Sequence, residues 1–521
     1  MLHLSTLNPE ISDLSGDSAR YLLLAQSISQ GKGYKEIEKP TAPPHLEYMP
    51  ALPLLLAGLV KLNLKDLRWA KMLIVGFAFL SMLAFFFFLW QENFLLRALV
   101  FLCFSTLPFL LLLETKILSD FPHLFFLLLS IIWFERLKKQ KEAGFSPWLF
   151  CGLIASIAFY FRQIAVIIFL AGALAILLTK KLKRKIALFG FSLGFLLPCS
   201  LWYLRNFFIA GSIEPSYGKK LWYAQASNPF AGTLSFGELI VRIGYRIKFY
   251  LFSLAQDFFL GRDFKFFSII WLALLVIILL GIGSELIKRR SIQSIYFFPY
   301  LIVISSWEGW VPRYFLPLIP LSLYFLLKGV EQIFIWLKKP EFKFKALLLI
   351  LSLLVFVNIY RVSEVVNFQH KKEMYPPKTL WQKEKSALAL LGEKNFSYYP
   401  DAFYWKKKGE EYFIAKCSTY YHFFAMAEFA RKNLEQDAVI VCRKPRLFGW
   451  LSQRKSIQFP AELALEKFFK KIIAKGGEYI LIEEISPALH QLLMKFWKTN
   501  PAQLEPVARF GETYLLKLRQ N

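Results

Sequence analysis

The chain has 521 residues, of which 56% are hydrophobic and 17% aromatic, with 54 copies of Phe. A composition this apolar, at this length, exceeds what soluble cores use and indicates a polytopic membrane protein. The formal net charge of +27 does not indicate nucleic-acid binding, because the basic residues lie in short clusters between apolar runs. The five cysteines lack paired metal-ligand spacing, and no cleavable signal peptide is visible.

The first distinctive stretch is Gly16-Asp17-Ser18-Ala19-Arg20-Tyr21, which puts a carboxylate in a polar loop just before the helical run 21–29. Capping of that helix by Asp17 is the structural alternative to a functional role. A stretch rich in Pro follows at 40–44. Tyr48-Met49-Pro50 then leads into an apolar run that ends at Val60. That run is too short to span a bilayer, so we expect an interfacial helix.

Apolar segments that could cross the membrane follow at 69–90, 94–113, 117–134, 148–178, 186–204, 266–284, 295–306, 314–337 and 346–360. The segment 148–178 is too long for one crossing and carries Arg162 and Gln163 at its middle. We expect it to form two short spans with Arg162 at the turn, which gives about ten spans in all.

Four short loops are strongly basic, at 136–141, 180–185, 288–290 and 338–345, and this is typical of cytoplasmic loops. An even number of crossings must then separate each from the next. This arrangement places the loop of Asp17, the start of the span at Asp120 and the turn at Arg162 on the outer face. Glu114, Arg205 and Arg313 fall on that face too. Ionisable groups at membrane depth are costly, so their clustering favours a functional site.

From about residue 361 the composition becomes mixed. Short β-rich runs at 438–442, 479–482 and 513–518 alternate with helical patterns at 420–434, 461–474 and 487–497. We expect a first extracytoplasmic loop with interfacial helices at 1–68, a transmembrane domain at 69–360 and a soluble extracytoplasmic α/β domain at 361–521. Cys417 and Cys442 would both lie in this exported domain, so the sequence leaves a disulfide between them open.

The charged residues suggest a chemistry. Carboxylates such as Asp17 and Asp120 suit removal of a proton from a hydroxyl, or coordination of a hard divalent cation with Glu114 as a tentative third ligand. Arginines suit a phosphate, which in a membrane implies a lipid phosphate. Structural alternatives remain: Asp120 is an acceptable helix start, Glu114 suits a membrane boundary, and Arg162 and Arg205 could reach lipid headgroups.

Several short stretches together resemble the membrane glycosyltransferases of the GT-C class, in the family 39-like group that includes protein O-mannosyltransferases, the aminoarabinose transferase of lipid A and the RgtA/B/C/D-like proteins. The matching stretches are Gly16 to Tyr21 with Leu24-Ala25 and Gly31-Lys32-Gly33-Tyr34, Tyr48 to Ala57, Leu118-Ser119-Asp120-Phe121-Pro122, Phe161-Arg162 and Arg313-Tyr314-Phe315-Leu316-Pro317-Leu318-Ile319-Pro320. Arg443-Lys444-Pro445-Arg446 with Gly449 and Trp450 resembles a stretch common in bacterial relatives, without an assignable function.

The resemblance implies an α-helical polytopic membrane protein of GT-C-like fold with a C-terminal extracytoplasmic α/β domain. It also implies transfer of a sugar from a polyprenyl phosphate to a hydroxyl of a lipid, glycan or protein on the outer face of the cell membrane. By this resemblance Asp17 is the base that activates the acceptor, and Asp120 is the second acidic site. The substrate-binding residues would be Arg313, Arg162, Arg205, Tyr48 and Tyr314. A divalent cation, Mg²⁺ or Mn²⁺, is left open, and no nucleotide is expected because no Gly-rich nucleotide loop follows a predicted strand.

One feature departs from this family: a transmembrane helix normally precedes the first loop, whereas sixteen residues precede Asp17 here. Either the start site has been placed too late, which we expect, or the N-terminal tail is exported without a helix of its own. Two other functions fit the sequence less well. A transporter or flippase of a lipid-linked saccharide would carry ionisable residues in the middle of several spans, and a membrane-anchored binding protein would leave the many spans unexplained.

Overall fold

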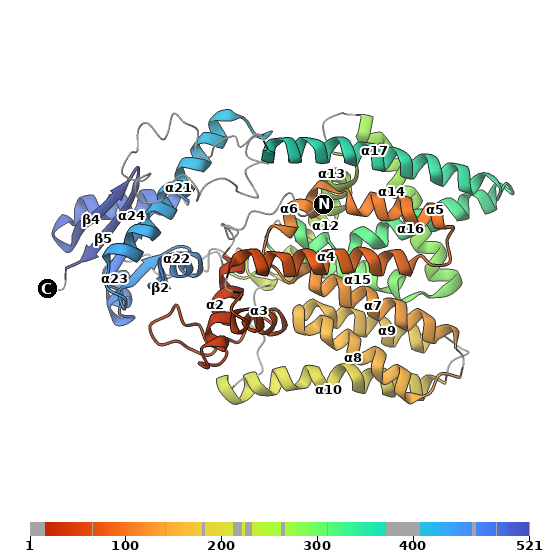
Figure 1. Ribbon diagram of the computed structural model, residues 1–521, viewed down its shortest axis with the longest axis horizontal. Helices are drawn as coiled ribbons and strands as arrows, with labels where there is room; N and C mark the ends of the chain where they lie inside the picture. The colour runs from red at the N-terminus through yellow and green to blue at the C-terminus, as the bar shows by residue number, and fades with distance from the viewer. Residues whose placement is uncertain are drawn as a thin grey trace.

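The computed structural model describes residues 16–519, apart from 65, 141, 180–182, 212–220, 225–231, 262–265, 310, 371–406, 461–464 and 486. Long helices lie side by side in a helical body, and the C-terminal strands and their helices lie beyond one end of it (Figure 1). Helices α2 and α3 lie where the two parts meet (Figure 1). The structure therefore confirms a mostly helical fold with a small C-terminal sheet.

The helical body begins with elements that lead up to the turn at Arg162. These are α2 (Asp17–Ser29), α3 (Ala51–Lys61), α4 (Leu67–Phe88), α5 (Phe94–Ser105), α6 (Pro108–Glu114), α7 (Asp120–Lys139), α8 (Phe145–Phe161) and the 3₁₀ turn η1 (Gln163–Ala165). The remaining elements of the body are α9 (Val166–Leu178), α10 (Arg184–Ala210), α12 (Phe236–Lys248), η3 (Phe249–Leu254), α13 (Ala255–Phe259), α14 (Phe266–Ser284), η4 (Glu285–Arg289), α15 (Ile292–Ser306), η5 (Pro312–Phe315), α16 (Leu318–Trp336) and α17 (Phe342–His370).

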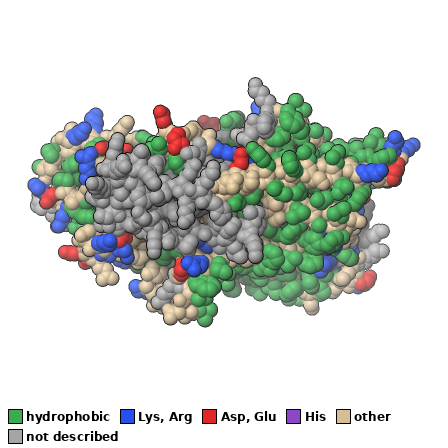
Figure 2. Space-filling model, turned by 45° about the horizontal axis from the view of Figure 1, so that its top comes forward, with side chains coloured by type: hydrophobic (Ala, Val, Ile, Leu, Met, Phe, Trp, Pro, Cys, Tyr) green, Lys and Arg blue, Asp and Glu red, His purple; other side chains and the backbone are tan. Residues whose placement is uncertain are grey.

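Five helices of the described chain are long and apolar enough to cross a membrane, namely α4, α10, α14 with its continuation η4, α16 and α17. Helices α5 and α6 form a sixth candidate bent by 57°, and the shorter apolar helices are α3, α8, η1 with α9, and α15. On the face shown in Figure 2, hydrophobic side chains cover most of the helical body. Exposed side chains of this kind belong in lipid, and the chain is a multi-pass membrane protein.

The helices agree with the predicted segments at the break near Arg162 and differ from them in their bounds elsewhere. The run 148–178 breaks at Arg162, as expected, because α8 ends at Phe161 and α9 begins at Val166. The run 94–113 is a bent pair and not one straight helix, with Pro108 opening α6. Helix α10 reaches Ala210, six residues past the predicted end, and α17 extends to His370.

The predicted basic loops gather at one end of the body. Lys138 Nζ donates to the carbonyls of Arg289 and Arg290 at 2.7 and 2.8 Å, and Arg290 donates to the carbonyl of Leu178 at the end of α9. Helix α7 runs from Asp120 to Lys139, a rise of roughly 30 Å. The acidic start of α7 and the basic loops therefore lie at opposite ends of the helical body.

The C-terminal part is a five-stranded sheet of order β2-β1-β3-β5-β4 with helices on both faces. Its elements are α21 (Glu410–Asn433), β1 (Val439–Cys442), α22 (Pro445–Ser452), β2 (Lys455–Gln458), α23 (Leu465–Ala474), β3 (Tyr479–Ile482), α24 (Pro487–Thr499), η7 (Pro501–Gln503), β4 (Leu504–Phe510) and β5 (Thr513–Leu518). Strand β1 pairs in parallel with β2 and β3, whereas β5 is antiparallel to β3 and β4.

Alternate residues of β1 serve the two faces of the sheet. Ile440 and Cys442 belong to the core beneath α21 and α22, while Val439 and Val441 belong to the core beneath α23 and α24. Cys417 and Cys442 are both buried free thiols, so the disulfide that the sequence left open is not formed in this structure. Ala19 of α2 packs into the core beneath α21 and α22 and so joins the helical body to the sheet.

The loop after α2 docks on the edge of the sheet. Lys455 Nζ donates to the carbonyl of Ile37 at 2.7 Å, and the backbone N–H of Ser456 donates to the carbonyl of Glu38 at 2.8 Å. Gly449 of α22 permits this approach, since a Cβ there would lie 3.0 Å from Cβ of Glu38 and 2.5 Å from Oγ of Ser456. The first loop and α22 are thereby held together.

Close packing of α14 on α16 generates a first prediction. A Cβ on Gly281 would lie 2.0 Å from the carbonyl oxygen of Phe325, whereas a Cβ on Gly283, on the same helix, would meet nothing within 4 Å. Gly281→Ala should lower stability by about 1–3 kcal/mol, because the two helices must move apart. Thermal unfolding of both variants in detergent checks this. Equal midpoints for Gly281→Ala and Gly283→Ala would contradict the packing.

Candidate active site

Asp17 is the first residue of α2 and does not cap it. Gly16 occupies the N-cap position with φ 81°, a left-handed conformation that suits glycine, and no side chain caps the helix. The Asp17 side chain turns instead to other segments: Oδ1 accepts a hydrogen bond of 2.5 Å from the Tyr48 hydroxyl, and Oδ2 forms an ion pair with Arg313. The capping interpretation is therefore wrong, and Asp17 joins three segments of the chain.

Arg446, from the first turn of α22, also lies beside Asp17. Its Nη1 donates to the Tyr48 hydroxyl at 2.8 Å and lies 3.9 Å from Asp17 Oδ1, and its guanidinium lies over the Tyr48 ring with Cζ 5.3 Å from the centroid. Sequence reasoning gave Arg446 no role. The basic run that starts at Arg443 and is followed by Gly449 is the only feature of the sequence that marks this stretch. It does not show that Arg446 contacts Tyr48 and Asp17, which are far away along the chain.

A second ion pair joins Asp120, the first residue of α7, to Arg162 at the break between α8 and α9. The two pairs meet at Tyr314. Cζ of Arg162 lies 4.7 Å from the Tyr314 ring centroid, and Cζ of Arg313 lies 5.6 Å from it. The structure thus brings together six predicted residues from distant segments, namely Asp17, Tyr48, Asp120, Arg162, Arg313 and Tyr314.

Two predicted site residues lie elsewhere. Arg205 donates from Nη1 to the carbonyl of His45 at 3.0 Å and packs against the rings of Tyr34 and Trp202, so it holds the loop between α2 and α3. Glu114 is fully buried at the end of α6, and none of the interactions described above for Asp17 and Asp120 includes it.

The tentative metal ligands are not gathered into one set. Within the residues that the structure describes, no group of three His, Cys, Asp or Glu side chains is placed to hold a metal ion. Asp17 and Asp120 each face an arginine, and a guanidinium at that distance competes with a divalent cation for the carboxylate. The arrangement does not fit a metal site formed by Asp17, Asp120 and Glu114.

The charge of Asp17 follows from these contacts. Burial raises the pKa of its carboxyl, but the positive charge of Arg313 and the hydrogen bonds from Tyr48 and Arg313 outweigh that effect. The net pKa lies below its usual range, and Asp17 is ionised at neutral pH. The carboxylate is therefore available as a proton acceptor, but Arg313 weakens it as a base.

Several buried polar atoms in and around this group have no hydrogen-bond partner among the described residues. They are Oδ2 of Asp120, Nε of Arg313 and the hydroxyls of Tyr250 and Tyr296. Tyr250 stacks on Phe315, and Tyr296 lies beside Tyr300, whose hydroxyl donates to the Tyr314 carbonyl at 2.8 Å. Unused buried donors and acceptors are costly, so their clustering points to a polar ligand.

The loop that carries Tyr48 is fixed by a buried network of charges. Arg20 Nη1 lies 2.5 Å from Glu38 Oε1 and 3.4 Å from Glu36 Oε2, and His45 Nδ1 lies 2.7 Å from Glu36 Oε1. His45 Nε2 accepts from the backbone N–H of Tyr48 at 2.7 Å. Since Nε2 accepts, the proton resides on Nδ1 and the ring is neutral. Burial lowers the pKa of His45 to about 4.

A scan against models of known protein families finds no match, and neither does a search of curated protein sequences. Two solved structures share the fold over almost the whole chain. The crystal structure of ArnT from Cupriavidus metallidurans bound to undecaprenyl phosphate matches with a TM-score of 0.55 and 10% identity, over 99% of this chain and 96% of that one. The apo structure of the same protein matches with a TM-score of 0.53 and 12% identity, over 99% and 95%.

The fold is therefore that of the GT-C glycosyltransferases, the class to which ArnT belongs. The GT-C-like architecture expected from the short sequence stretches is confirmed. At these identities the likeness concerns the fold, and the arguments for function come from the side chains around Asp17.

The neutral His45 generates a prediction on pH. Its pKa of about 4 lies below the unfolded value of roughly 6.5, so the unfolded chain binds more protons between these values. The stabilisation is fully present above pH 6.5 and is lost as the pH falls toward 4, by at most about 1.4 kcal/mol per pH unit. Glu36 has its pKa lowered mainly by His45 and Arg20 against the effect of burial, so its own contribution is lost only below roughly pH 4.5.

Thermal midpoints of the wild type should therefore fall between pH 7 and pH 5, and His45→Gln should show a flatter dependence over this range because it has no ring to protonate. Parallel curves for the two proteins would show that His45 is already charged in the folded state.

Proposed function

We propose that the protein is an integral membrane glycosyltransferase that moves a sugar from a polyprenyl-phosphate donor to an acceptor hydroxyl. The observation that carries the proposal is a largely buried carboxylate, Asp17, held between two arginines from distant parts of the chain, Arg313 and Arg446. A carboxylate suits the proton of an attacking hydroxyl, and arginines suit a phosphate.

The reaction we infer is a displacement at the anomeric carbon. The acceptor oxygen forms a bond to that carbon while the bond from the carbon to the phosphate oxygen breaks. The acceptor proton passes to Asp17, and the electron pair of the broken bond leaves with the polyprenyl phosphate. Arg313 and Arg446 stabilise the charge that grows on the leaving phosphate. Asp120 and Arg162 form the neighbouring wall, and the unused hydroxyls of Tyr250 and Tyr296 provide partners for sugar hydroxyls.

Undecaprenyl phosphate is bound in one of the two ArnT structures of the same fold, which supports a lipid phosphate for this chain as well. We propose the same class of carrier here, and an acceptor that is a lipid, a glycan or a protein. No metal ion takes part in any step of this scheme, and among the residues that the structure describes the carboxylates lend no support to the Mg²⁺ or Mn²⁺ that the sequence left open.

We also propose that the Asp17 end of the helical body and the C-terminal sheet are extracytoplasmic in a cell membrane. The gathering of basic loops at the other end supports this orientation, because short loops rich in Lys and Arg stay in the cytoplasm. A transporter or flippase is not favoured, since the charged groups around Asp17 lie at helix starts and breaks and not along the middle of spans.

Replacing Asp17 tests the proposed base. Asp17→Asn keeps the shape and loses the basic oxygen, so we expect normal insertion and donor binding but transfer about a hundredfold slower or more. The measurement is single-turnover transfer of labelled sugar from the lipid donor. Asp257, which faces Arg361 at 3.7 Å, provides the matched control, and Asp257→Asn should transfer at the wild-type rate. Near wild-type turnover of Asp17→Asn would place the base elsewhere, with Asp120 the next residue to test.

The arginines are tested separately. Each charge-assisted contact to phosphate is worth about 1.5–3 kcal/mol, so Arg446→Ala should lower the rate of transfer by roughly tenfold to a hundredfold. Arg313→Lys keeps the charge but loses the planar fork and should fall between the wild type and Arg313→Ala. Arg443→Ala, from the same basic run, is the control for Arg446 and should leave transfer unchanged. Equal rates for Arg446→Ala and Arg443→Ala would remove Arg446 from the site.

A further inference from the structure

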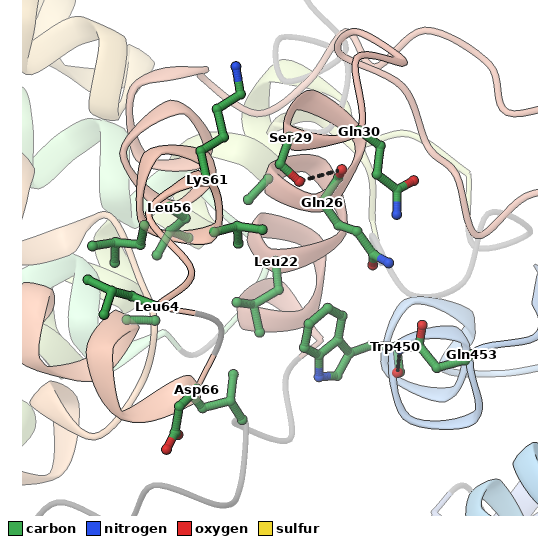
Figure 3. A pocket seen from close by; sticks show the side chains of 15 residues that line it. Leu22, Gln26, Ser29, Gln30, Leu56, Lys61, Leu64, Asp66, Trp450 and Gln453 are labelled. Carbon is green, nitrogen blue, oxygen red and sulfur yellow. Dashed lines mark hydrogen bonds between the residues drawn. The ribbon is translucent and has the colours of Figure 1, made fainter.

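A strongly charged cavity lies at the end of the helical body opposite Asp17. It has a volume of about 370 Å³ and lies between the end of α4, the last two turns of α7, η4 with the start of α15, and α16. Four basic and three acidic side chains line it. The cavity between α2, α3 and α22 is larger, about 450 Å³, but only Lys61 and Asp66 bring charge to its wall (Figure 3). Of these two cavities, the one at α7 is suited to an ionic ligand.

The α7 side chains that line the charged cavity share one face of the helix. Ile132, Glu135, Arg136 and Lys139 recur at intervals of three and four residues. Ile132 follows Asp120 by twelve residues, a rise of about 18 Å, so the cavity is well separated from the ion pairs around Tyr314. None of the residues that line it takes part in the chemistry proposed at Asp17.

One wall of the cavity is an irregular turn that is fixed by hydrogen bonds. The segment η4, Glu285–Arg289, is π-helical, and Arg290 after it has a φ of 46°, which is uncommon for a residue other than glycine. Lys138 Nζ donates to the carbonyl of Arg290, and the backbone N–H of Ile292 donates to Glu135 Oε1 at 2.8 Å. The turn is thereby held against the end of α7. Short π-helical segments occur frequently at functional sites.

The deep part of the cavity presents hydrogen-bond acceptors. Glu285 is 4% exposed, its Oε2 accepts from the Tyr324 hydroxyl at 2.8 Å, and its Oε1 lies 3.4 Å from Nη1 of Arg289. Gln293 is 2% exposed, and within the described chain its Oε1 accepts no hydrogen bond. A buried acceptor without a donor is costly, so this part of the cavity is suited to a ligand that donates.

The basic side chain in the deep part is already engaged. Lys328 Nζ donates to Glu92 at 2.7 Å and to Glu331 at 3.1 Å. Glu135 makes both of its contacts, with the Ile292 backbone and with Lys138, through Oε1. The negative charges of Glu135 and Glu285 also repel each other. A positively charged donor between these two carboxylates would therefore be stabilised.

The mouth of the cavity is basic and aromatic. Arg136 and Lys139 are exposed, and neither has an acidic partner among the residues that the structure describes. Phe87 and Trp90 are 49% and 57% exposed. Helix α4 is a candidate span that ends at Phe88, so these two rings lie where a span meets the membrane surface. Basic side chains at this depth are suited to the phosphate of a lipid.

We propose that the cavity binds the headgroup of a phospholipid that ends in a primary ammonium, namely phosphatidylethanolamine. The ammonium lies in the deep part, because its three N–H donors match the carboxylate of Glu285 and the unused oxygen of Gln293. The phosphate lies at the mouth on Arg136 and Lys139, and the acyl chains pass the aromatic rings at the end of α4 into the bilayer. Phosphatidylcholine carries no N–H donor and would leave Gln293 unsatisfied.

The test uses the full-length chain in phosphatidylcholine nanodiscs that contain phosphatidylethanolamine, its N,N-dimethyl derivative or phosphatidylglycerol. Native mass spectrometry counts the lipids retained, with free phosphoethanolamine as a competitor. We expect phosphatidylethanolamine to be retained in preference to the other two lipids. Its retention should fall about tenfold in Gln293→Met and in the double variant Arg136→Ala with Lys139→Ala.

The matched control is the double variant Lys185→Ala with Lys345→Ala, which removes two exposed basic residues from other loops at the same end and should retain the lipid as the wild type does. Equal retention of phosphatidylglycerol would overturn the ammonium site. Displacement by free phosphoethanolamine at equal concentration would overturn the lipid as ligand. Equal retention by the two double variants would place the lipid elsewhere. Arg136 and Lys139 are exposed, so their variant keeps the test valid should Gln293→Met fold poorly.

Discussion

The ion pair between Asp17 and Arg313 is the interaction on which the candidate site depends. The two side chains are 22% and 18% exposed, and taking charges out of water costs several kcal/mol for each ion unless they are paired. Pairing therefore fixes the start of α2 against η5, across 296 positions of sequence. Once these two segments are in register, Tyr48 reaches the other oxygen of the carboxylate, and Arg313 meets Arg162 across the ring of Tyr314.

A second group of charges, around Arg20, fixes the loop that docks on the edge of the C-terminal sheet beside α22, the helix of Arg446. Arg20 binds Glu38 and Glu36 from beneath the loop, and the backbone of that loop pairs with Lys455 and Ser456 at the edge of the sheet. Helix α22 is thereby brought to the start of α2. The site is thus shared between the helical body and the C-terminal sheet, which explains why a residue near position 446 can act beside one at position 17.

Short-range patterns explain what the sequence could predict. Apolar runs predicted most of the long helices, and the pair Arg162 and Gln163 predicted the break between α8 and α9. Runs of β-branched residues predicted β1, β3 and β5. Strands β2 and β4 were missed for physical reasons: both lie at sheet edges, β2 is the polar run Lys-Ser-Ile-Gln, and β4 contains Pro506. The sequence also does not show which distant residues contact one another. Nothing local to Arg205 shows that it holds the His45 carbonyl, and nothing local to Arg446 shows that it meets Tyr48.

The ion pair with Arg313 that holds Asp17 in place also weakens this carboxylate as the proposed base. Arg313 keeps the carboxylate ionised but lowers its pKa, and a carboxylate of lower pKa is a weaker base. A donor phosphate beside Arg313 would share the guanidinium, which reduces the attraction that lowers the pKa of Asp17. Binding of the donor would therefore strengthen the base just when an acceptor hydroxyl can use it. Without the donor, Asp17 stays bound to Arg313, so the same ion pair that assembles the site would also make the strength of the base depend on the donor phosphate.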